Sequence, residues 1–368
     1  MAPVPEPSIQ SGVPLAARTS LRVGGPARWF TVASSSEDVA GAHAWSRAHG
    51  VPMVVLGGGT NAVIADTGLE ALVVAVQPRG LSVVEDREAL AVTAAAGEPW
   101  DAVVEASVAR GGAGLECLSG IPGLTGGTPI QNVGAYGQDV SGVIADVTAF
   151  DTANGVTVTI PAAECGFAYR ASRFKGSDAG RFVVCAVRFR LQKRPPTTAY
   201  AEVASALARE GVTHPSVADV RAAVLAVRRR KAMVIDASDP DTRSVGSFFT
   251  NPVLSAGDAE SVAVRAGAAP PVFPQAGGQV KVPAAWLIER AGYAKGTREG
   301  AVGLSSKHTL AIVTRDGATA ADVIRFACRV AQRVEARFGV RLRPEPVLLG
   351  FAGSDVEADV EYLLGARN

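Results

Sequence analysis

Ser247 lies in a segment whose composition suits chemistry at a ligand. Residues 244–252 read SVGSFFTNP, so Gly246 precedes this serine and two phenylalanines follow it. The glycine lets the backbone approach a ligand closely, and the phenylalanines would form a dry wall. No His or Asp stands beside Ser247 to act as a base, so a proton donor fits this hydroxyl better than a nucleophile. A turn at the end of a strand is the alternative that needs no ligand.

Arg170 could bind a carboxylate, and the backbone around Glu345 is restrained. Arg170 stands in the basic, aromatic-flanked residues 169–175, and its guanidinium offers a fork of donors to a carboxylate. A solvated surface loop is the alternative, because charged side chains lie outside by default. Glu345 stands between two prolines, which fix the backbone around it. This pattern indicates a placed carboxyl, and a carboxylate on an edge strand would show the same pattern.

Two glycine-rich segments indicate a bound phosphate compound. Residues 119–137 read SGIPGLTGGTPIQNVGAYG, and residues 56–61 read LGGGTN. Backbone N–H groups in such turns form concave nests for phosphates, and the amides of Gln131 and Asn132 suit the edge of a heterocycle. The shorter segment follows a predicted strand but lacks the GxGxxG spacing and the helix of a Rossmann site, so a tight turn without ligand stays open. Two such loops favour a large diphosphate cofactor held from two sides.

Composition excludes several classes of function. The 368 residues carry a net charge of +1, which argues against a nucleic-acid partner, and their number allows two or three domains. No run of 18 apolar residues occurs, so no membrane span is expected. The four cysteines lack CxxC spacing and form no ligand-spaced cluster with the four histidines. We therefore expect reduced thiols, a cytoplasmic location and no metal site, with residues 1–7 as a loose tail rather than a secretory signal.

The elements that must position these residues read as an α+β body with short strands. A capping box at Ser34 starts a helix that closes at Gly50, and further helices start at Pro99, Ser216 and Thr319. The helix from Ser216 ends in the basic run 228–231, which complements the helix dipole or binds a substrate phosphate. A last helix is expected at 284–291. The predicted strands are 52–56, 72–76, 81–84, 89–95, 143–150, 155–160, 182–191, 309–313 and a strand-like stretch at 340–351.

Together these motifs resemble the UDP-N-acetylenolpyruvoylglucosamine reductase family, flavin enzymes of peptidoglycan precursor synthesis. The resemblance spans about residues 19–350, and Tyr200 matches a substrate-side tyrosine of the longer family subtype. Pro346 departs from the valine expected after the glutamate, and Ala171 stands where an acidic residue is frequent. The matching pieces, in family order, are residues 19–27, 56–61, 123–137, 169–175, 246–252, 284–288 and 344–345.

The resemblance implies an α+β architecture. Its FAD-binding part is the vanillyl-alcohol-oxidase (PCMH) type, built from two subdomains, and a C-terminal α+β domain covers the substrate. The implied ranges are an FAD-binding domain at 19–193 with subdomains at about 19–80 and 81–193, a connecting helix region at 194–232, a substrate-binding domain at 233–340, and a C-terminal strand returning to the FAD domain, with the tail, at 341–368.

The resemblance also implies the chemistry and its residues. Non-covalent FAD takes a hydride from NADPH, and the substrate is the enolpyruvyl ether of UDP-N-acetylglucosamine. Arg170 and Glu345 match the residues that bind and polarise its carboxylate, with Glu345 protonated or acting through a shared proton, and Ser247 matches the proton donor. The residues implied to hold FAD are Gly57, Gly58, Gly59, Thr60, Asn61, Ser119, Gly120, Gly123, Gly126, Gln131, Asn132, Gly134 and Ala135. Those implied to bind the substrate are Tyr136, Tyr200, Lys231, Asn251 and Lys281.

Three other functions remain in view. A flavin oxidase of the same fold would act on an alcohol or sugar with O₂, but many such relatives attach the flavin through His, and none occurs between His49 and His214. A non-catalytic nucleotide-binding regulator would need the glycine loops without Arg170, Ser247 and Glu345 together. A Rossmann dehydrogenase is disfavoured by the missing GxGxxG pattern. We expect a monomer that binds small molecules.

Overall fold

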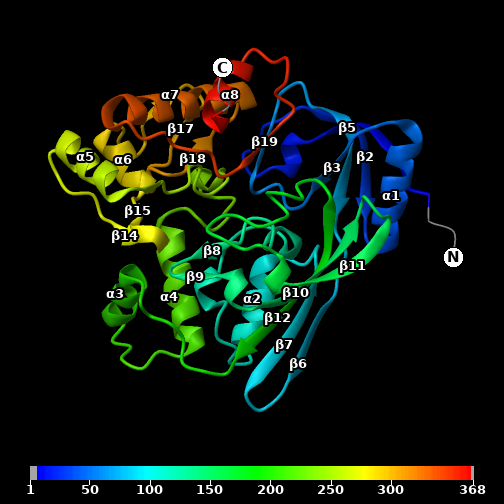
Figure 1. Ribbon diagram of the computed structural model, residues 1–368, viewed down its shortest axis with the longest axis horizontal. Helices are drawn as coiled ribbons and strands as arrows, with labels where there is room; N and C mark the ends of the chain where they lie inside the picture. The colour runs from blue at the N-terminus through cyan, green and yellow to red at the C-terminus, as the bar shows by residue number, and fades with distance from the viewer. Residues whose placement is uncertain (1–5, 366–368) are drawn as a thin grey trace. The chain divides into compact units, whose positions relative to one another are not determined.

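The computed structural model describes residues 6–365, which form two compact units (Figure 1). Unit 1 contains Ala27–Gly59 and Glu70–Val234, together with the described residues before Pro14. Unit 2 contains Pro14–Pro26, Thr60–Leu69 and the described residues from Ile235 onwards. The ends of the expected tails, residues 1–5 and 366–368, lie outside the described part of the chain. Each unit therefore gathers several stretches, whereas the ranges expected from the sequence are contiguous.

Unit 1 contains two larger sheets, and its core lies between their strands and helices α1 (Ser36–His49) and α2 (Trp100–Val108). In the first sheet, β3 and β5 run parallel, with Met53 opposite Leu72. Its strands, in sheet order, are β1 (Gln10–Pro14), β2 (Pro26–Ala33), β5 (Leu69–Val76) and β3 (Met53–Leu56). The second sheet is antiparallel, in the order β11 (Val156–Pro161), β10 (Ile144–Asp151), β12 (Phe182–Gln192), β7 (Ala89–Ala95) and β6 (Leu81–Glu85).

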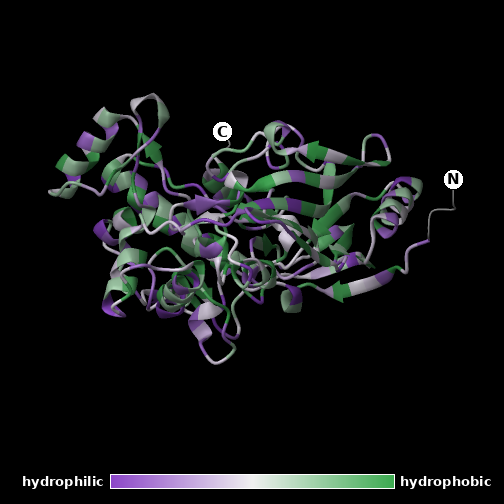
Figure 2. Ribbon diagram, turned by 90° about the horizontal axis from the view of Figure 1, so that it is seen from below, coloured by the Kyte–Doolittle hydropathy of each residue, from purple (hydrophilic) through white to green (hydrophobic). Residues whose placement is uncertain are grey.

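Helices of unit 1 begin and end where capping residues stand. Helix α1 (Ser36–His49) starts at Ser35, whose side chain accepts from Asp38 N, and ends at Gly50 with φ 64°. The expected capping box at Ser34 is thus wrong by one residue. Hydrophobic and hydrophilic residues alternate along α1, as Figure 2 shows. Further helices of unit 1 are α2 (Trp100–Val108), α3 (Ala201–Arg209) and α4 (Val217–Arg230).

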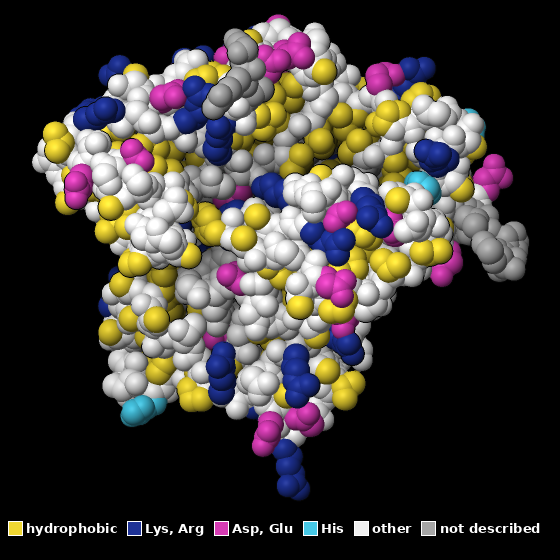
Figure 3. Space-filling view, viewed as in Figure 1, with side chains coloured by type: hydrophobic (Ala, Val, Ile, Leu, Met, Phe, Trp, Pro, Cys, Tyr) yellow, Lys and Arg dark blue, Asp and Glu magenta, His cyan; other side chains and the backbone are white. Residues whose placement is uncertain are grey.

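The turn of the β6–β7 hairpin consists of four exposed, charged residues. Residues 85–88 read EDRE, and Figure 3 shows side chains of both charges at that end of the hairpin. Asp86 accepts from Glu88 N at 2.8 Å and from Ala89 N at 2.7 Å, which closes the turn. The Asp86 carboxylate thus takes the place of backbone carbonyl groups as the acceptor for these two N–H groups.

Unit 2 packs around helix α7 (Ala320–Phe338), whose N-cap Thr319 forms the predicted helix start as a full capping box with Asp322. Ten α7 residues are buried, among them Phe326 and Phe338. The other helices of unit 2 are α5 (Ala256–Ala266), α6 (Ala284–Arg290) and α8 (Glu357–Leu364). Its strands are β4 (Ala62–Ile64), β13 (Val253–Leu254), β14 (Phe273–Pro274), β15 (Val280–Lys281), β16 (Arg298–Glu299), β17 (Val302–Leu304), β18 (Ile312–Thr314) and β19 (Val347–Leu349).

The C-terminal strand pairs with a distant segment of the chain. β19 runs parallel to β4, with Val347 opposite Ala62, and Ala65 N donates to Leu349 O at 2.9 Å. This pairing explains why residues 60–69 belong to unit 2. The predicted strand-like stretch at 340–351 is limited to β19, and the residues that follow it contain helix α8.

Candidate active site

The two glycine-rich segments approach each other within unit 1. A Cβ atom added at Gly58 would lie 3.1 Å from the Cα of Gly123, which is tighter than nearly all real contacts. At Gly57 and Gly127 the added atom would meet nothing within 4 Å, so both positions border open space. The two loops therefore form a shared backbone surface with room beside it, and the residues present fit a diphosphate cofactor such as FAD.

Helix α2 holds the longer glycine loop in place. Trp100 N donates to Gly123 O at 3.0 Å, and Gly120 N donates to Asp101 Oδ1 at 2.6 Å. Burial alone would raise the pKa of Asp101, but hydrogen bonds from Arg221 and Gly120 N lower it overall. A charged carboxylate at the start of α2 therefore anchors the first turn of the loop.

Asn132 connects the glycine loop to the segment that carries Arg170. It adopts φ 46° and is 3% exposed. Its Nδ2 donates to Ala168 O at 3.1 Å, and its Oδ1 accepts from Ser141 N at 3.1 Å. The amide therefore has partners inside the protein, and its implied contact with FAD stays a prediction. Ser119 is likewise buried, with its hydroxyl donating to Glu116 O at 2.7 Å.

The Arg170 guanidinium is fixed by the carbonyls of the glycine loop. Its Nη1 donates to Asn132 O at 3.4 Å, and its Nη2 donates to Gly134 O. The Cζ atom lies 5.3 Å from the centre of the Tyr169 ring, and the residue itself has φ 53°. The segment is a loop, as predicted, but the side chain is half-buried rather than solvated. A cation is thus positioned next to the end of the proposed cofactor loop.

Glu116 is a functional candidate that sequence reasoning missed. Its side chain is fully buried and accepts from Gly114 N at 2.6 Å and from Gln138 Nε2 at 2.7 Å. Gln138 belongs to the β8–β9 pair (Gly134–Ala135 and Gln138–Asp139), so this carboxyl orients the hairpin that follows the glycine loop. A charged residue within the apolar stretch 113–118 was the available signal.

Ser247 and Glu345 come from distant parts of the sequence and are brought together in unit 2. Glu345 N donates to Phe248 O at 2.8 Å, and Phe249 pairs with Pro344 as an antiparallel bridge. Gly246 adopts φ 74°, a conformation that favours glycine, so the close turn before Ser247 is confirmed.

The two phenylalanines after Ser247 lie in the hydrophobic core, and their role as a dry wall beside a ligand stays a prediction. Phe248 and Phe249 are 0% and 1% exposed, and their ring centres lie 5.2 Å apart. Both belong to the core around α7, so the backbone that carries Ser247 rests on a rigid support.

Asn61 contacts the glutamate segment, and its expected contact with the cofactor stays a prediction. Its Nδ2 donates to Glu345 O at 3.5 Å, and Val347 N donates to its carbonyl at 2.9 Å. The LGGGTN segment is therefore divided: Gly57–Gly59 belong to unit 1, and Thr60 and Asn61 belong to unit 2.

The two tyrosines implied to bind substrate contact each other in unit 1. The rings of Tyr136 and Tyr200 lie 5.2 Å apart at 88°, an edge-to-face pair. Burial raises the pKa of Tyr136 to about 12, so its phenol stays protonated and can donate a hydrogen bond. Tyr200 is the N-cap of α3 and is 39% exposed.

The basic run 228–231 divides into three environments. Arg228 points into unit 1, is 7% exposed, and donates from Nη2 to Met233 O at 2.7 Å. Arg229 and Arg230 are exposed. Lys231, the C-cap of α4, donates to Glu202 Oε2 at 2.6 Å. The run is thus more than a solvated helix end, and Lys231 is already paired with a carboxylate.

The remaining predicted substrate residues lie near one another in unit 2. Asn251 Oδ1 accepts from Ala284 N at 2.9 Å and so caps the start of α6. Lys281 lies in β15 opposite Val253. Val253 is two residues after Asn251 in the chain. Their contact with substrate stays a prediction. Lys281 lies in the central strand of the β13–β15–β14 sheet, and Asn251 lies just before β13.

Three further features concern the cysteines, possible metal ligands and possible membrane-spanning helices. All four cysteines are free and buried. Between residues 6 and 365, no group of three or more His, Cys, Asp or Glu side chains is arranged to hold a metal ion. Within the same part of the chain, no helix combines the length and the apolar character needed to cross a membrane.

Known proteins resemble this chain along nearly its whole length. A family model described as an FAD binding domain matches residues 27–160, and one described as the UDP-N-acetylenolpyruvoylglucosamine reductase C-terminal domain matches residues 239–349. The reductase of that name from Thermobifida fusca is 49% identical over 353 residues, which cover 93% of this chain and 98% of that protein. The one from Salinispora arenicola is 48% identical over 342 residues, covering 91% and 94%. The crystal structure of the Thermus caldophilus reductase aligns with a TM-score of 0.62 over 94% of this chain and 99% of that chain, at 23% identity, and supports the fold.

Proposed function

The chain belongs to the UDP-N-acetylenolpyruvoylglucosamine reductase family, and we propose how its own residues carry out the family's reaction. It is an FAD-dependent oxidoreductase of peptidoglycan precursor synthesis that uses NADPH. The reaction adds a hydride and a proton across the enolpyruvyl double bond of UDP-N-acetylglucosamine enolpyruvate and gives UDP-N-acetylmuramate. When bound, FAD accepts the hydride from NADPH and delivers it to the terminal vinyl carbon.

Gly57, Gly58 and Gly123 are the residues that we propose to hold the cofactor's diphosphate. The close approach at Gly58 and the open space beside Gly57 support this assignment, because a backbone cradle needs both. Gly120, Gly126, Gln131, Gly134 and Ala135 continue the same loop and complete the proposed FAD site. Thr60 and Asn61 follow these glycines in the chain and are also proposed to contact FAD.

Arg170 and Glu345 are the residues that we propose to polarise the substrate's carboxylate. Negative charge grows beside that carboxylate once the hydride reaches the vinyl carbon. Fixed donors in a dry site stabilise such charge by typically a few kcal/mol per group. Hydrogen bonds to Asn132 O and Gly134 O hold the Arg170 guanidinium, so little reorganisation is needed. Glu345 would serve in its protonated form or through a shared proton.

Ser247 is the proposed donor of the proton to the carbon next to the carboxylate. One observation carries this assignment: Phe248, the next residue, receives a hydrogen bond from Glu345 N on its carbonyl. This bond pairs the backbone next to Ser247 with the backbone of Glu345. The serine hydroxyl and the glutamate carboxyl are thus carried by neighbouring segments, as two groups acting on adjacent substrate atoms would require. A hydroxyl is a weak acid, so it donates as negative charge accumulates.

Tyr136, Tyr200, Lys231, Asn251 and Lys281 are the proposed contacts to the nucleotide sugar. The protonated phenol of Tyr136 and the cations of Lys231 and Lys281 suit a diphosphate. Lys231 would exchange the Glu202 carboxylate for a substrate phosphate.

A two-step anaerobic experiment tests the proposal. The purified protein should be yellow, with a flavin that acid precipitation releases. We expect Ser247→Ala to leave flavin reduction by NADPH intact and to slow reoxidation by the enolpyruvyl substrate by at least about 10²-fold. Ser261→Ala, which changes an exposed serine of α5, is the matched control. An equal loss in both steps would make Ser247 structural, and rapid turnover with O₂ alone would favour an oxidase.

We also propose that the chain acts in the cytoplasm as a monomer. Four free, buried cysteines suit a reducing compartment, and NADPH and nucleotide sugars are metabolites of such a compartment. Light scattering after size-exclusion chromatography would measure the mass, and a stable dimer would contradict this proposal.

A further inference from the structure

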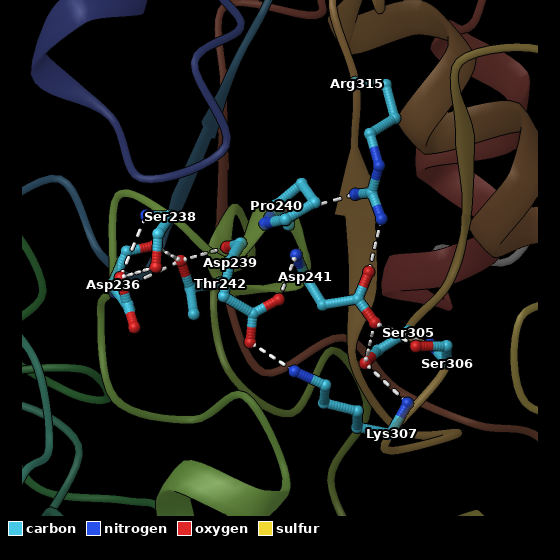
Figure 4. Close-up of polar contacts among 10 residues, drawn as sticks. All are labelled: Asp236, Ser238, Asp239, Pro240, Asp241, Thr242, Ser305, Ser306, Lys307 and Arg315. Carbon is cyan, nitrogen blue, oxygen red and sulfur yellow. Dashed lines mark hydrogen bonds and ion pairs between the residues drawn. The ribbon is translucent and has the colours of Figure 1, made fainter.

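Asp241 is a nearly buried carboxylate that the proposed reaction does not use. It lies in the 3-10 turn η6 (Pro240–Thr242) of unit 2 and is 4% exposed. Its Oδ2 accepts from Ser306 N at 2.8 Å, Ser306 Oγ at 2.7 Å and Ser305 Oγ at 3.0 Å, and its Oδ1 accepts from Arg315 (Figure 4). Burial alone would raise the pKa of Asp241, but the Ser306 hydroxyl and Arg315 lower it to about 2, so the carboxylate is charged at neutral pH.

The two serines bound by Asp241 begin a turn that ends beside Ser247. Ser305 N donates to Ala311 O at 2.9 Å, which closes the 305–311 turn. Leu310 O in the same turn accepts from Phe248 N at 2.8 Å. The amide that follows Ser247 therefore bonds to a turn whose first two residues are held by one carboxylate.

The residues between Asp241 and Ser247 lie beside β18, the strand that comes after the 305–311 turn. Thr314 N donates to Arg243 O at 3.1 Å, and Ser244 pairs with Val313 of β18. The Asp241 carboxylate thus connects residues 241–248 to the first two residues of the stretch 305–314. Further along, backbone hydrogen bonds pair the two stretches, and the last of these bonds is at Phe248. Loss of the carboxylate would leave Arg315 without its ion-pair partner and two serine hydroxyls without an acceptor.

We propose that Asp241 is a positioning residue for the proton-transfer step. It fixes the 305–311 turn, the turn fixes Phe248, and Phe248 in turn sets both the Ser247 hydroxyl and the backbone of Glu345. The inference rests on the proposed function, because Ser247 must be the proton donor for its position to matter. A displacement of about 1 Å at a reacting group is enough to cost on the order of 10²-fold in rate.

The same cluster contains a matched control. Asp236 is exposed, and its Oδ1 accepts from Ser238 N at 2.9 Å and from Ser238 Oγ at 2.6 Å (Figure 4). Among the described contacts of the cluster, this carboxylate has no hydrogen bond to Asp241, Ser305, Ser306 or Arg315. Asp236→Asn therefore removes a carboxylate of the same type and keeps every contact of the Asp241 carboxylate.

The experiment measures both half-reactions of the FAD-loaded enzyme. We expect Asp241→Asn to slow reoxidation by the enolpyruvyl substrate by about 10-fold or more, at saturating substrate, and to change flavin reduction by less than about 2-fold. Asp236→Asn should change either step by less than about 3-fold. Equal slowing of both steps by Asp241→Asn would overturn the inference.

A double-mutant cycle distinguishes an effect of Asp241 through Ser247 from a general structural effect. If Asp241 acts through Ser247, Asp241→Asn should slow reoxidation by less than about 2-fold when Ser247 is already alanine. Full additivity would overturn the inference. Ser247→Ala alone tests the proposed function, so failure of that single variant is distinguishable from failure of the cycle. If Asp241→Asn does not fold, Ser306→Ala replaces it, because it removes one bond to Asp241 and keeps the bond from Ser306 N.

Discussion

Gly58→Ala tests the contact between the two glycine loops. The added methyl would lie 3.1 Å from Gly123 Cα, 3.5 Å from Gly123 C and 3.6 Å from Leu124 Cγ, so backbone must shift by a few tenths of an ångström. Overpacking of this kind costs about 1–3 kcal/mol. Replacing a glycine also restricts the unfolded chain, which returns about 0.4–1 kcal/mol. We therefore expect a net loss of up to about 2.5 kcal/mol in the stability of the FAD-free protein.

The loss should be visible in two measurements. The melting temperature of the FAD-free protein should fall by up to roughly 5–10 °C, and the dissociation constant of FAD should rise, about tenfold for each 1.4 kcal/mol lost from the cradle. Gly142→Ala is the control, since that exposed position has nothing within 4 Å and no positive φ. Identical melting and FAD affinity in the two variants would refute the argument that the loops form one cradle.

Three further predictions follow from the site. Gly57→Ala should leave the melting temperature of the FAD-free protein unchanged but weaken FAD binding in a fluorescence titration. The reason is that its added methyl enters the open space where we place the cofactor. Unchanged FAD affinity would contradict this placement of the cofactor. Glu202→Gln should lower KM for the nucleotide sugar by up to about 5-fold, with KM for NADPH as the control, because a partly exposed ion pair with Lys231 is worth at most about 1 kcal/mol; a higher KM would mean that Glu202 orients the lysine. Asp241 has a pKa of about 2 in the folded protein, below about 3.9 for an unfolded chain, so its contribution to stability is complete above about pH 4 and is lost as pH falls towards 2. Urea unfolding at pH 6 and pH 3 should show a smaller acid loss for Asp241→Asn than for the unchanged protein.

Local signals in the sequence predicted the elements that local chemistry determines. Ser216 and Thr319 begin α4 and α7 with full capping boxes, and the hairpin at 81–95 has the expected strands. The first cap was assigned to Ser34 rather than Ser35 because three consecutive serines offer the same hydroxyl. The strand expected at 309–313 is only Ile312–Thr314, since residues 309–311 complete the turn that receives Phe248 N.

Long-range pairing explains what the sequence could not show. Arg170, Ser247 and Glu345 were assigned by resemblance, and no spacing along the chain reveals that Glu345 N meets Phe248 O. Asp241 lies in residues 239–242, DPDT, which read as an ordinary turn. Its role depends on serines more than 60 residues away, and such a partner leaves no local pattern.

The pairing of β4 with β19 has a consequence for how the protein is made. Val347 leaves the ribosome 285 residues after its partner Ala62, which is roughly 15–60 s at ordinary rates of synthesis. Throughout that interval Val63 and Ile64, fully buried in the finished molecule, have no strand beside them. A growing chain with an unpaired apolar strand is a ready substrate for chaperones and for aggregation. Slower translation of the last third of the gene should therefore lower the yield of folded enzyme more than equal slowing at its start.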